Sequence, residues 1–537
     1  MVSMHHSPSA RSNSLEDEKN ENAGAEMVET VSQAHGSVEE GAWASAKKNP
    51  KVILYSTAAC VSSMLWGFDI GVNSISVALP AFKMVFGYEY EGELLISATW
   101  NALWTAMTSL GMLIAHFIEG SIICGWVSDR GGRRLGFGTG SAISLLGVGL
   151  EYAAKEPGML LAGKIINGLA LGFFLTLGST YASEIAPTAL RPSLTAAVNL
   201  FINAGQLMAI GIGNTRFAIM LPSSYKVIFA AQWAFPCFIA LLAIFMPESP
   251  WYLLRSGQIE QAKKSLQRLH LNATDTTAIL EEIQASIAAQ NAIADIQRDT
   301  SYWDCFRGTN WRRTRISCGM FAVQQFTGIA FYSQALYFLG ISGLPTALTF
   351  QLALGGFGVA MLGNIVSWFI MNYIGRRPLL LTGILLNGLC LMSVGVAGCF
   401  TTMAALYYIG YVMNFAQIFY APTVGAVSWT ISAEVSSVNV RAKTQSLAIG
   451  TNALVSWAMN FIAPYLINTD EANLGGKAAF VWMALSFVSL VWAWFEVPEL
   501  KDRTFAELDE IFASVTPTRK FKKAMVDSSS SSNDVSS

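Results

Sequence analysis

The chain has 537 residues, of which 53% are hydrophobic and only 13% are charged, and its formal net charge at pH 7 is −2. Soluble globular proteins carry about 25% charged residues, so this composition excludes an ordinary soluble domain. The near-neutral charge gives no indication of a nucleic-acid partner. The seven cysteines form no CxxC pair, and four of the five histidines lie in the N-terminal tail or a central polar segment. We therefore expect a membrane protein without a disulfide framework, a metal cluster or a cofactor.

Twelve apolar stretches are each long enough to cross about 30 Å of hydrocarbon as an α-helix, which takes roughly 20 residues. In chain order they span residues 52–79, 98–126, 134–154, 158–182, 194–214, 228–246, 315–340, 345–373, 379–400, 404–432, 444–467 and 478–497. The chain before the first stretch is polar and has no apolar run, which predicts a disordered tail and no cleaved signal peptide.

The last six apolar stretches repeat the charged motifs of the first six in the same order. GWVSDRGGRRLG after the second stretch matches NYIGRRPLLL after the eighth, SEIAPTALR matches AEVSSVNVR, and PESPWYLL matches PELKDRTF. The polar segment between the halves contains QIEQAKKSLQRLH and ILEEIQASIAAQ, whose periodicity predicts amphipathic helices on the cytosolic face. A parallel repeat of six plus six helices is typical of transporters whose halves rock around a central binding site.

This repeat predicts an all-α membrane protein with twelve transmembrane helices in two halves. The expected regions are a disordered cytosolic tail (1–50), an N-terminal six-helix half (51–246), a cytosolic linker (247–313), a C-terminal six-helix half (314–497) and a cytosolic C-terminal tail (498–537). With both termini inside, 28 of the 34 lysines and arginines fall in cytosolic segments and five fall in outer loops. This asymmetry is typical of membrane proteins and predicts cytosolic termini.

The charged motifs lie at the predicted cytosolic helix ends and supply candidates for a cytosolic gate. These residues are Asp129, Arg130, Arg133, Arg134, Glu184, Arg191, Glu248, Arg376, Arg377, Glu434, Arg441 and Glu499. We expect them to pair across the halves and with helix N-termini, which holds the outward-open state closed on its inner side. A single GRR cluster would indicate only a positive-inside membrane anchor. The repetition of three motifs in register favours a gate.

Eight motifs together resemble the sugar porter family of the major facilitator superfamily. They are GFDIG, DRGGRR, SEIAPTALR, PESPWYLL, QQFTG, GRRPLLL, AEVSSVNVRAK and PELKDRTFAELDEIF. The resemblance covers residues 60–512, and FGYEYEG with RTFAELDEIF is similar to fungal α-glucoside and hexose porters. It implies a multi-pass transporter, not an enzyme, that works with a small sugar, protons and the lipid bilayer. The sequence lacks a GxxxxGK[ST] phosphate-binding loop and a nucleophile elbow, so we expect transport driven by a gradient.

A sugar offers hydroxyl groups and apolar ring carbons, so its site requires hydrogen-bonding amides and an aromatic face. Polar amides inside the apolar stretches are therefore candidates, and the resemblance implies which of them contact the sugar. The expected substrate-binding residues are Gln206, Gln324, Gln325, Trp429 and Asn460. The alternative is that the amides only link helices by hydrogen bonds, worth roughly 0.6–2 kcal/mol each.

The sequence departs from the family pattern at three places. Ala330 stands where the QQxxGxN motif has an amide, and Gly425-Ala426 stands where the tenth helix usually has a Gly-Pro hinge. Asn372 stands where the second GRR motif usually begins with Asp. The missing amide at Ala330 removes a sugar contact and weakens the expectation of simple hexose specificity.

Asp69, in LWGFDIGVNS, lies inside the first apolar stretch, where a charge costs at least roughly 2.5–3.5 kcal/mol unless it is paired or neutralised. Lys164, in GKIINGLALG of the fourth stretch, is a possible partner. Because desolvation favours a protonated carboxyl and a nearby cation favours an ionised one, movement of Lys164 relative to Asp69 would change the affinity for a proton. The resemblance implies this role too, with Arg in place of Lys. The alternative is a static ion pair that fixes helix packing.

The leading prediction is uptake of a sugar with a proton across a plasma membrane by alternating access, with an α-glucoside such as maltose favoured over a hexose. A second interpretation keeps the fold but changes the cargo to a polyol, a quinate-like acid or an exported metabolite. A third is a sugar sensor that does not transport. Sensors of this family have long signalling tails, whereas about 25 residues follow Phe512, so transport is favoured.

Overall fold

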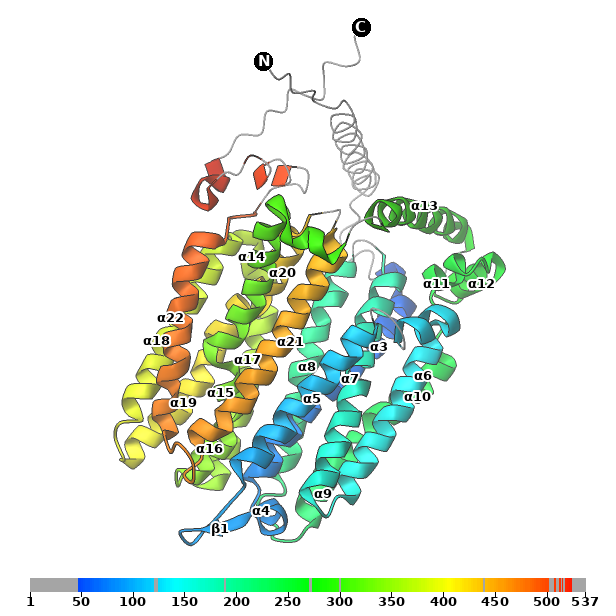
Figure 1. The fold of residues 1–537 in the computed structure, drawn as a ribbon. Helices are drawn as coiled ribbons and strands as arrows, with labels where there is room; N and C mark the ends of the chain where they lie inside the picture. Colours follow the sequence, from blue (N-terminus) through cyan, green and yellow to red (C-terminus); the bar gives the residue numbers. More distant parts are fainter. Residues whose placement is uncertain are drawn as a thin grey trace, which may run out of the picture.

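The computed structural model describes residues 47–119, 124–187, 190–269, 273–298, 301–437 and 440–501, together with 507–508, 511–512, 514 and 517–523. This part of the chain is almost entirely helical, as expected, apart from a two-stranded antiparallel hairpin of β1 (Tyr88–Tyr90) and β2 (Glu93–Leu95). Figure 1 shows long helices side by side. The hairpin and α4 (Pro80–Phe86) lie at one end of the bundle, here named the hairpin end. Most of the two expected terminal tails lies outside the described residues.

The N-terminal half consists of six long helical segments, the first of which begins with a proline. They are α3 (Pro50–Ala78), α5 (Ala98–Glu119), α6 (Cys124–Ala153), α7 (Pro157–Ile185), α8 (Arg191–Asn214) and the consecutive pair α9 (Ser223–Gln232) and α10 (Ala234–Phe245). Proline at the first turn suits α3 and α7 because the amide it removes has no partner within the helix. Gly67 allows α3 to touch α8, since a Cβ there would lie 1.8 Å from the Ile202 carbonyl oxygen.

The C-terminal half has the same number of long segments in the described chain, but two of them are interrupted. The segments are α14 (Gly308–Gln324) with η2 (Gln325–Ile329), α15 (Ala330–Ser333) and α16 (Ala335–Ile341); α17 (Thr346–Tyr373); α18 (Arg376–Ala397); α19 (Met403–Tyr420) with η3 (Ala421–Gly425) and α20 (Ala426–Val435); α21 (Arg441–Ile467); and η5 (Gly475–Ala478) with α22 (Ala479–Glu496). Both η2 and η3 are single turns of π-helix. Such turns inside long helices frequently mark functional sites.

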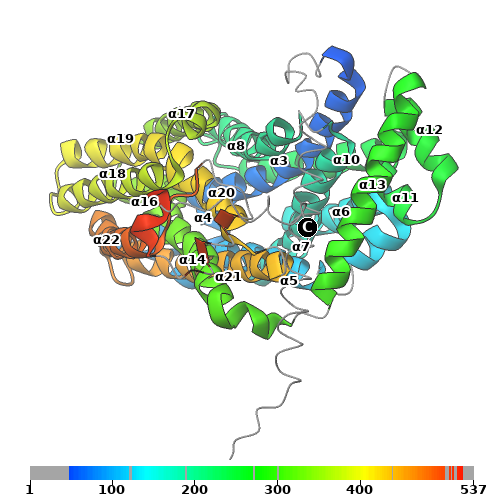
Figure 2. The same ribbon diagram turned by 90° about the horizontal axis from the view of Figure 1, so that it is seen from above.

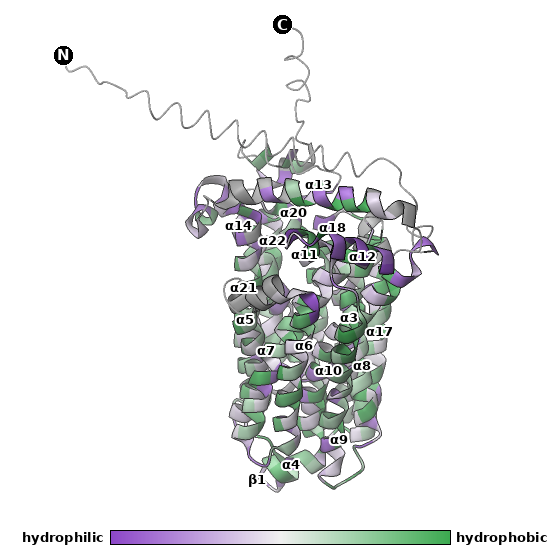
Figure 3. Cartoon of the chain, turned by 90° about the vertical axis from the view of Figure 1, so that its right-hand side faces the viewer, coloured by the Kyte–Doolittle hydropathy of each residue, from purple (hydrophilic) through white to green (hydrophobic). Residues whose placement is uncertain are grey.

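The segment between the halves forms α11 (Pro250–Arg255), α12 (Ile259–Leu269) and α13 (Ala273–Arg298), followed by a short turn η1 (Tyr302–Phe306). The two stretches expected to be helical lie in α12 and α13. They lie at the opposite end from the hairpin, here named the linker end (Figures 1 and 2). Ala262, Ser265, Leu266 and Leu269 make up the buried face of α12, at helical spacing. The hydropathy colouring in Figure 3 shows mainly apolar long helices and strongly hydrophilic residues on α12.

Within the described residues, seven helices are long and apolar enough to cross a membrane by length and composition alone. The other long segments are either interrupted or carry more polar residues. Their bounds nevertheless follow the apolar stretches predicted from sequence, so the alternation of six segments, linker and six segments is present in the structure.

Candidate functional site

Asp69 of α3 and Lys164 of α7 form the predicted ion pair inside the N-terminal half. The Lys164 Nζ atom lies 2.8 Å from Asp69 Oδ1, and the two side chains are 1% and 0% exposed. Asn167, one turn further along α7, donates from Nδ2 to the same Asp69 oxygen at 3.1 Å. An ammonium and an amide therefore hold one oxygen of a carboxylate that has no access to solvent.

Sequence reasoning missed a third charged residue in this cluster. Glu151 of α6 is fully buried, and its Oε2 atom lies 3.4 Å from Lys164 Nζ. Gln232, the last residue of α9, donates from Nε2 to the same Glu151 oxygen at 3.2 Å. Glu151 stands near the end of a predicted helix, where acidic residues are ordinarily solvated, but its position within the apolar stretch 134–154 is a signal of burial.

Small residues bring α6 and α7 close enough for this contact. A Cβ at Gly163 would lie 2.8 Å from Glu151 Cγ and 2.9 Å from the Glu151 backbone nitrogen. Ser144 Oγ lies 2.9 Å from Asn167 Oδ1, in hydrogen-bond contact, which orients the Asn167 amide toward Asp69. The sequence AGKIING thus supplies both the ammonium and the glycine that lets a carboxylate approach it.

A small cavity adjoins Lys164 on the side facing the hairpin end. Its polar lining comes from Asn73 and Ser76 of α3, Asn101 and Thr105 of α5, and Lys164 itself. Phe82 of α4 contributes to the apolar wall. Polar groups therefore continue from the charged cluster toward the hairpin end.

The predicted glutamine pair lies in the C-terminal half at the first helix interruption. Gln324 donates from Nε2 to the Gly425 carbonyl at 3.1 Å and accepts from Asn452 Nδ2 at 2.9 Å. Gln325 donates from Nε2 to Asn452 Oδ1 at 3.4 Å. The Gln325 Oε1 atom is buried and accepts no hydrogen bond from a described residue. The two glutamines and Asn452 of α21 therefore form one group of neutral amides.

The interruptions of the seventh and tenth segments are joined through Gln324. Its backbone lies at the start of η2, where Gly328 adopts φ +96°, and its side chain bonds the last residue of η3. The tenth segment is interrupted although it lacks a Gly-Pro hinge, because η3 contains Pro422 instead. Ala330 is buried at the start of α15 and offers no amide to this region.

The other three predicted substrate residues make no hydrogen bond to this amide group among those described. Trp429 of α20 is half exposed and meets the Phe321 ring edge-on, with centroids 4.7 Å apart. Gln206 of α8 is half-buried, and no described side chain hydrogen-bonds it. Asn460 donates back to Ser456 in its own helix at 2.9 Å. The amide of α21 that reaches the glutamines is Asn452, two turns before Asn460, a position that spacing alone does not distinguish.

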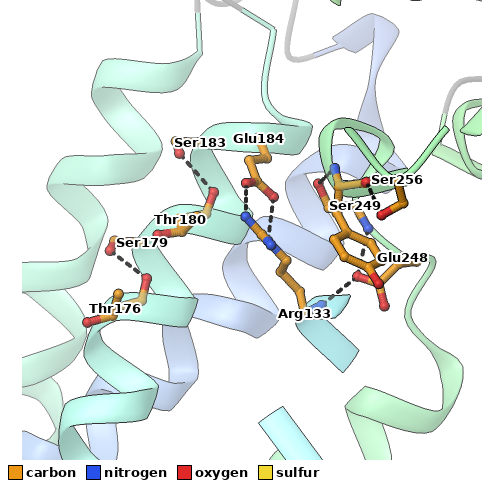
Figure 4. Close-up of polar contacts among 10 residues, drawn as sticks. Arg133, Thr176, Ser179, Thr180, Ser183, Glu184, Glu248, Ser249 and Ser256 are labelled. Carbon is orange, nitrogen blue, oxygen red and sulfur yellow. Dashed lines mark hydrogen bonds and ion pairs between the residues drawn. The ribbon is translucent and has the colours of Figure 1, made fainter. Parts of the chain in front are cut away.

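At the linker end of the N-terminal half, Arg133 joins two predicted gate residues. Its Nη2 and Nε atoms donate to the two oxygens of Glu184 at 2.6 and 3.1 Å, while its backbone nitrogen donates to Glu248 at 2.8 Å (Figure 4). The Arg134 backbone nitrogen donates to the other Glu248 oxygen at 3.2 Å. Glu248 thus binds the first amides after Gly132, which has φ +84°.

The C-terminal half repeats this arrangement. Arg376 donates to Glu434 at 3.1 Å, and Glu499 accepts from the backbone nitrogens of Arg376 and Arg377 at 3.0 and 3.3 Å. Arg441 donates from Nη2 to the Ser436 carbonyl at 3.5 Å. In this structure each described ion pair of these residues joins helices of the same half, so their pairing across the halves, which is expected for an outward-open state, stays a prediction. The side chains of Asp129, Arg130 and Arg191 lie outside the described part.

Within the described residues, hydrogen bonds between the halves are concentrated at the hairpin end. They run from Ser74 Oγ to the Ser333 carbonyl (2.7 Å), Asn468 Nδ2 to the Ile96 carbonyl (2.9 Å), Tyr465 to Thr99 Oγ1 (3.0 Å), Tyr337 to the Ile96 carbonyl (3.4 Å), Asn101 Nδ2 to Gln334 Oε1 (3.5 Å) and Tyr88 to Asp470. Nearer the middle, Asn199 donates to Asn364 at 2.9 Å. The halves are therefore closed together at the hairpin end, whereas the ion pairs described for the linker-end motifs lie within each half.

Comparison with known proteins gives one consistent family. The sequence profile described as "Sugar (and other) transporter" matches residues 55–512. The MFS transporter fmqE of Aspergillus fumigatus is 34% identical over 470 residues, covering 87% of this chain and 86% of that protein. The general alpha-glucoside permease of Saccharomyces cerevisiae is 30% identical over 522 residues, covering 95% of this chain and 84% of that protein.

Solved structures agree with the fold. The partially occluded inward-open xylose transporter XylE from E. coli superposes with a TM-score of 0.68 at 19% identity, covering 85% of this chain and all of XylE. XylE bound to 6-bromo-6-deoxy-D-glucose, described as a proton:xylose symporter, gives a TM-score of 0.65 at 20% identity over 86% of this chain and 99% of that one. These similarities confirm the predicted all-α fold of twelve helices in two halves.

Proposed function

The chain belongs to the sugar transporter family of the major facilitator superfamily, and on that basis we propose that it takes up a sugar together with a proton by alternating access. Family membership makes it a multi-pass membrane transport protein. The proposal goes further in naming the driving ion, the cargo and the direction. The observation that carries it is the fully buried Asp69–Lys164 pair.

A buried carboxylate and ammonium provide a physical basis for coupling. The Lys164 ammonium lies 2.8 Å from the Asp69 carboxylate. In general, a nearby cation favours an ionised carboxylate, whereas burial without a cation favours a protonated one. A helix movement that separates α3 from α7 therefore changes whether the site holds a proton. Lysine makes a single-point contact here, where arginine would offer a bidentate fork, so less geometry has to be broken when the pair separates.

The neutral amides of the C-terminal half suit a sugar. Gln324, Gln325 and Asn452 present donors and acceptors next to one another, and neutral groups match hydroxyls without binding ions strongly. Gln206, Trp429 and Asn460 complete the proposed site. Relatives named as alpha-glucoside permeases cover most of this chain at about 30% identity, and we take an α-glucoside as the cargo.

The conformation supports the alternating-access part of the proposal. Contacts between halves close the hairpin end, while the charged motifs at the linker end bond within each half. We assign the linker end to the cytosol, with both termini, and the hairpin end to the outside of a plasma membrane. In this assignment the moving bodies are the halves 51–246 and 314–497, joined by 247–313. When the halves rock, the motifs Arg133–Glu184 and Arg376–Glu434 approach each other.

A non-sugar cargo is the second candidate. Ala330 removes an amide from the region of the glutamine pair, and the relative with 34% identity is named only as an MFS transporter. A polyol or a quinate-like acid would need fewer or differently placed donors. Transport direction is part of the same question, because an exported metabolite is compatible with this fold.

The test is uptake of labelled maltose by yeast that lacks its own sugar porters, with and without a protonophore. The proposal predicts accumulation that the protonophore abolishes and that unlabelled maltose competes away. Competition by a polyol or quinate, but not by maltose or glucose, would replace the cargo while keeping the mechanism. Accumulation that persists in the protonophore would reject proton coupling.

A further inference from the structure

We propose that Glu151 is the second counterion of Lys164, and that it keeps the ammonium paired when Asp69 takes up a proton. The inference rests on the proposed role of Asp69 in proton coupling and adds a residue to it. The Asp69–Lys164 pair does not explain why a second carboxylate, that of Glu151, is fully buried in contact with the same ammonium.

The geometry places Lys164 between the two carboxylates. Its Nζ atom lies 2.8 Å from Asp69 Oδ1 and 3.4 Å from Glu151 Oε2. The amide of Asn167 donates to Asp69 and also to Gln232 Oε1 at 3.4 Å, and Gln232 in turn donates to Glu151. The two carboxylates are therefore linked twice, once through the ammonium and once through a chain of two amides.

The net charge of the three buried groups depends on whether one carboxylate is protonated. With one ammonium and two ionised carboxylates the cluster carries one excess negative charge, and burying an uncompensated charge is costly. One added proton makes the cluster neutral. Asp69 Oδ2 and Glu151 Oε1 are both buried without a hydrogen-bond partner among the described residues, so each carboxylate has an oxygen available for that proton.

The step is a proton transfer with an exchange of partner. A hydronium ion gives its proton to Asp69 Oδ2, forming an O–H bond and leaving water, and Asp69 becomes neutral. Lys164 then loses its attraction to Asp69 and moves toward Glu151, whose carboxylate is already within 3.4 Å and oriented by Gln232. In a pair without Glu151 the same protonation would leave the ammonium buried and unpaired, which opposes proton uptake.

No other described charged group contacts the cluster. Of the elements packed on α6, α7 contributes Lys164, α9 contributes the neutral Gln232, and the sequences of α10 and of α5 from residue 98 to 115 contain no charged residue. The short helix α11 also packs on α6, at the linker end, and its Arg255 is exposed. Lys226 of α9 lies instead over the ring of Tyr152, 5.7 Å from its centroid. The polar cavity beside Lys164, lined by Asn73 and Ser76, gives water a place next to the cluster.

The experiment is a pH titration of the purified protein in lipid bilayers, followed by the infrared C=O stretch of protonated carboxyl groups. The band assigned to Asp69 is the one that Asp69→Asn removes. In Glu151→Gln, Lys164 has Asp69 as its single counterion and the like charge is gone, so the midpoint of that band moves toward acid by about one pH unit or more. Glu151→Asp shifts it by less in the same direction.

Glu156→Gln is the matched control, because Glu156 is an exposed carboxylate five residues further along the chain. It leaves the midpoint unchanged. An unchanged midpoint in Glu151→Gln overturns the inference, as does a carboxyl band that is present at every pH and absent from Glu151→Gln, since Glu151 would then be neutral throughout. The titration needs no sugar, so its outcome is separate from that of the maltose uptake test, which alone decides the cargo.

Discussion

The two halves of this protein are alike at the linker end and different in the interior. In each half an arginine side chain pairs with one glutamate and its backbone nitrogen donates to a second: Arg133 with Glu184 and Glu248, and Arg376 with Glu434 and Glu499. In the interior, the N-terminal half buries Asp69, Lys164 and Glu151, whereas the corresponding depth of the C-terminal half carries neutral glutamines and an asparagine.

The repeated motifs indicate two copies of one six-helix unit, and the interiors of the two copies differ in the ligands that they suit. In the proposed function the repeated ends serve a task that both halves share, which is to approach and separate at the linker end. The interior charges suit an ion and the interior amides suit a hydroxylated cargo. The helix interruptions η2 and η3 occur in the half with the amides, so local rearrangement is expected where the cargo binds.

The largest effect is expected from removing the cation of the charged half. Lys164→Met leaves two buried carboxylates without a counterion, which costs about 3–5 kcal/mol of stability at neutral pH. The loss decreases in acid, because protonation removes the unpaired charges. Thermal unfolding of the purified protein in detergent at pH 5 and pH 7.5 measures both effects, with the exposed Lys155→Met as control. Equal melting temperatures for Lys164→Met and wild type would contradict the role of the ammonium.

Variants of the amide half should change cargo affinity and leave proton coupling intact. Asn452→Ala removes the partner of both glutamines, and loss of about 1.4 kcal/mol of binding raises KM for maltose roughly tenfold. Asn460→Ala, in the same helix, has a smaller effect because Asn460 bonds its own helix. Uptake kinetics measured at two external pH values separate affinity from coupling. If either variant changed the pH dependence of uptake and left KM unchanged, the assignment of the amides to cargo binding would be wrong.

The repeated linker ends differ in burial, which sharpens the comparison between halves. The Arg133–Glu184 pair is 8% and 11% exposed and bidentate, whereas the Arg376–Glu434 pair is 24% exposed on both sides with a single described hydrogen bond. Lysine cannot reproduce a bidentate fork. We expect Arg133→Lys to reduce the uptake rate by about fivefold, roughly 1 kcal/mol, and Arg376→Lys to reduce it less. Initial-rate measurements in which Arg376→Lys slows uptake more than Arg133→Lys would contradict the greater importance of the buried, bidentate pair.

The smallest effect is expected at the exposed hairpin. Tyr88 donates to Asp470 across the halves, but both the contact and the hairpin are solvent-exposed. Exposed polar contacts contribute about 0–1 kcal/mol, so Tyr88→Phe should change KM for maltose by less than about fivefold. Loss of most of the uptake in this variant would make the hairpin an essential latch.

Residues that are chemically out of place in an apolar stretch can be predicted from the sequence. Asp69 and Lys164 stand out in this way, and their pairing is present in the structure. The glutamine pair follows from the same reasoning, and the twelve helical segments follow from apolar length. The internal duplication is visible in the sequence too, because the three charged motifs recur in the same order in both halves.

Other features depend on geometry that spacing does not encode. Glu151 lies near a helix end in sequence, and only the glycine contact between α6 and α7 shows that it is buried against Lys164. Asn452 and Asn460 are both amides of one helix, and the interruption at η2 determines which of them meets the glutamines. The gate residues can be recognised in the sequence as charged helix ends, but their partners depend on the conformation, which in this structure keeps each described pair within its half.

The most direct test of the account is whether adding maltose moves protons. Cells expressing the protein, in weakly buffered medium, are given maltose while the external pH is recorded. The account predicts that wild type raises the external pH on sugar addition, and that Asp69→Asn gives no pH change while still exchanging labelled for unlabelled maltose. A pH rise that persists in Asp69→Asn, or maltose accumulation in wild type without any pH change, would contradict the coupling role of the buried carboxylate.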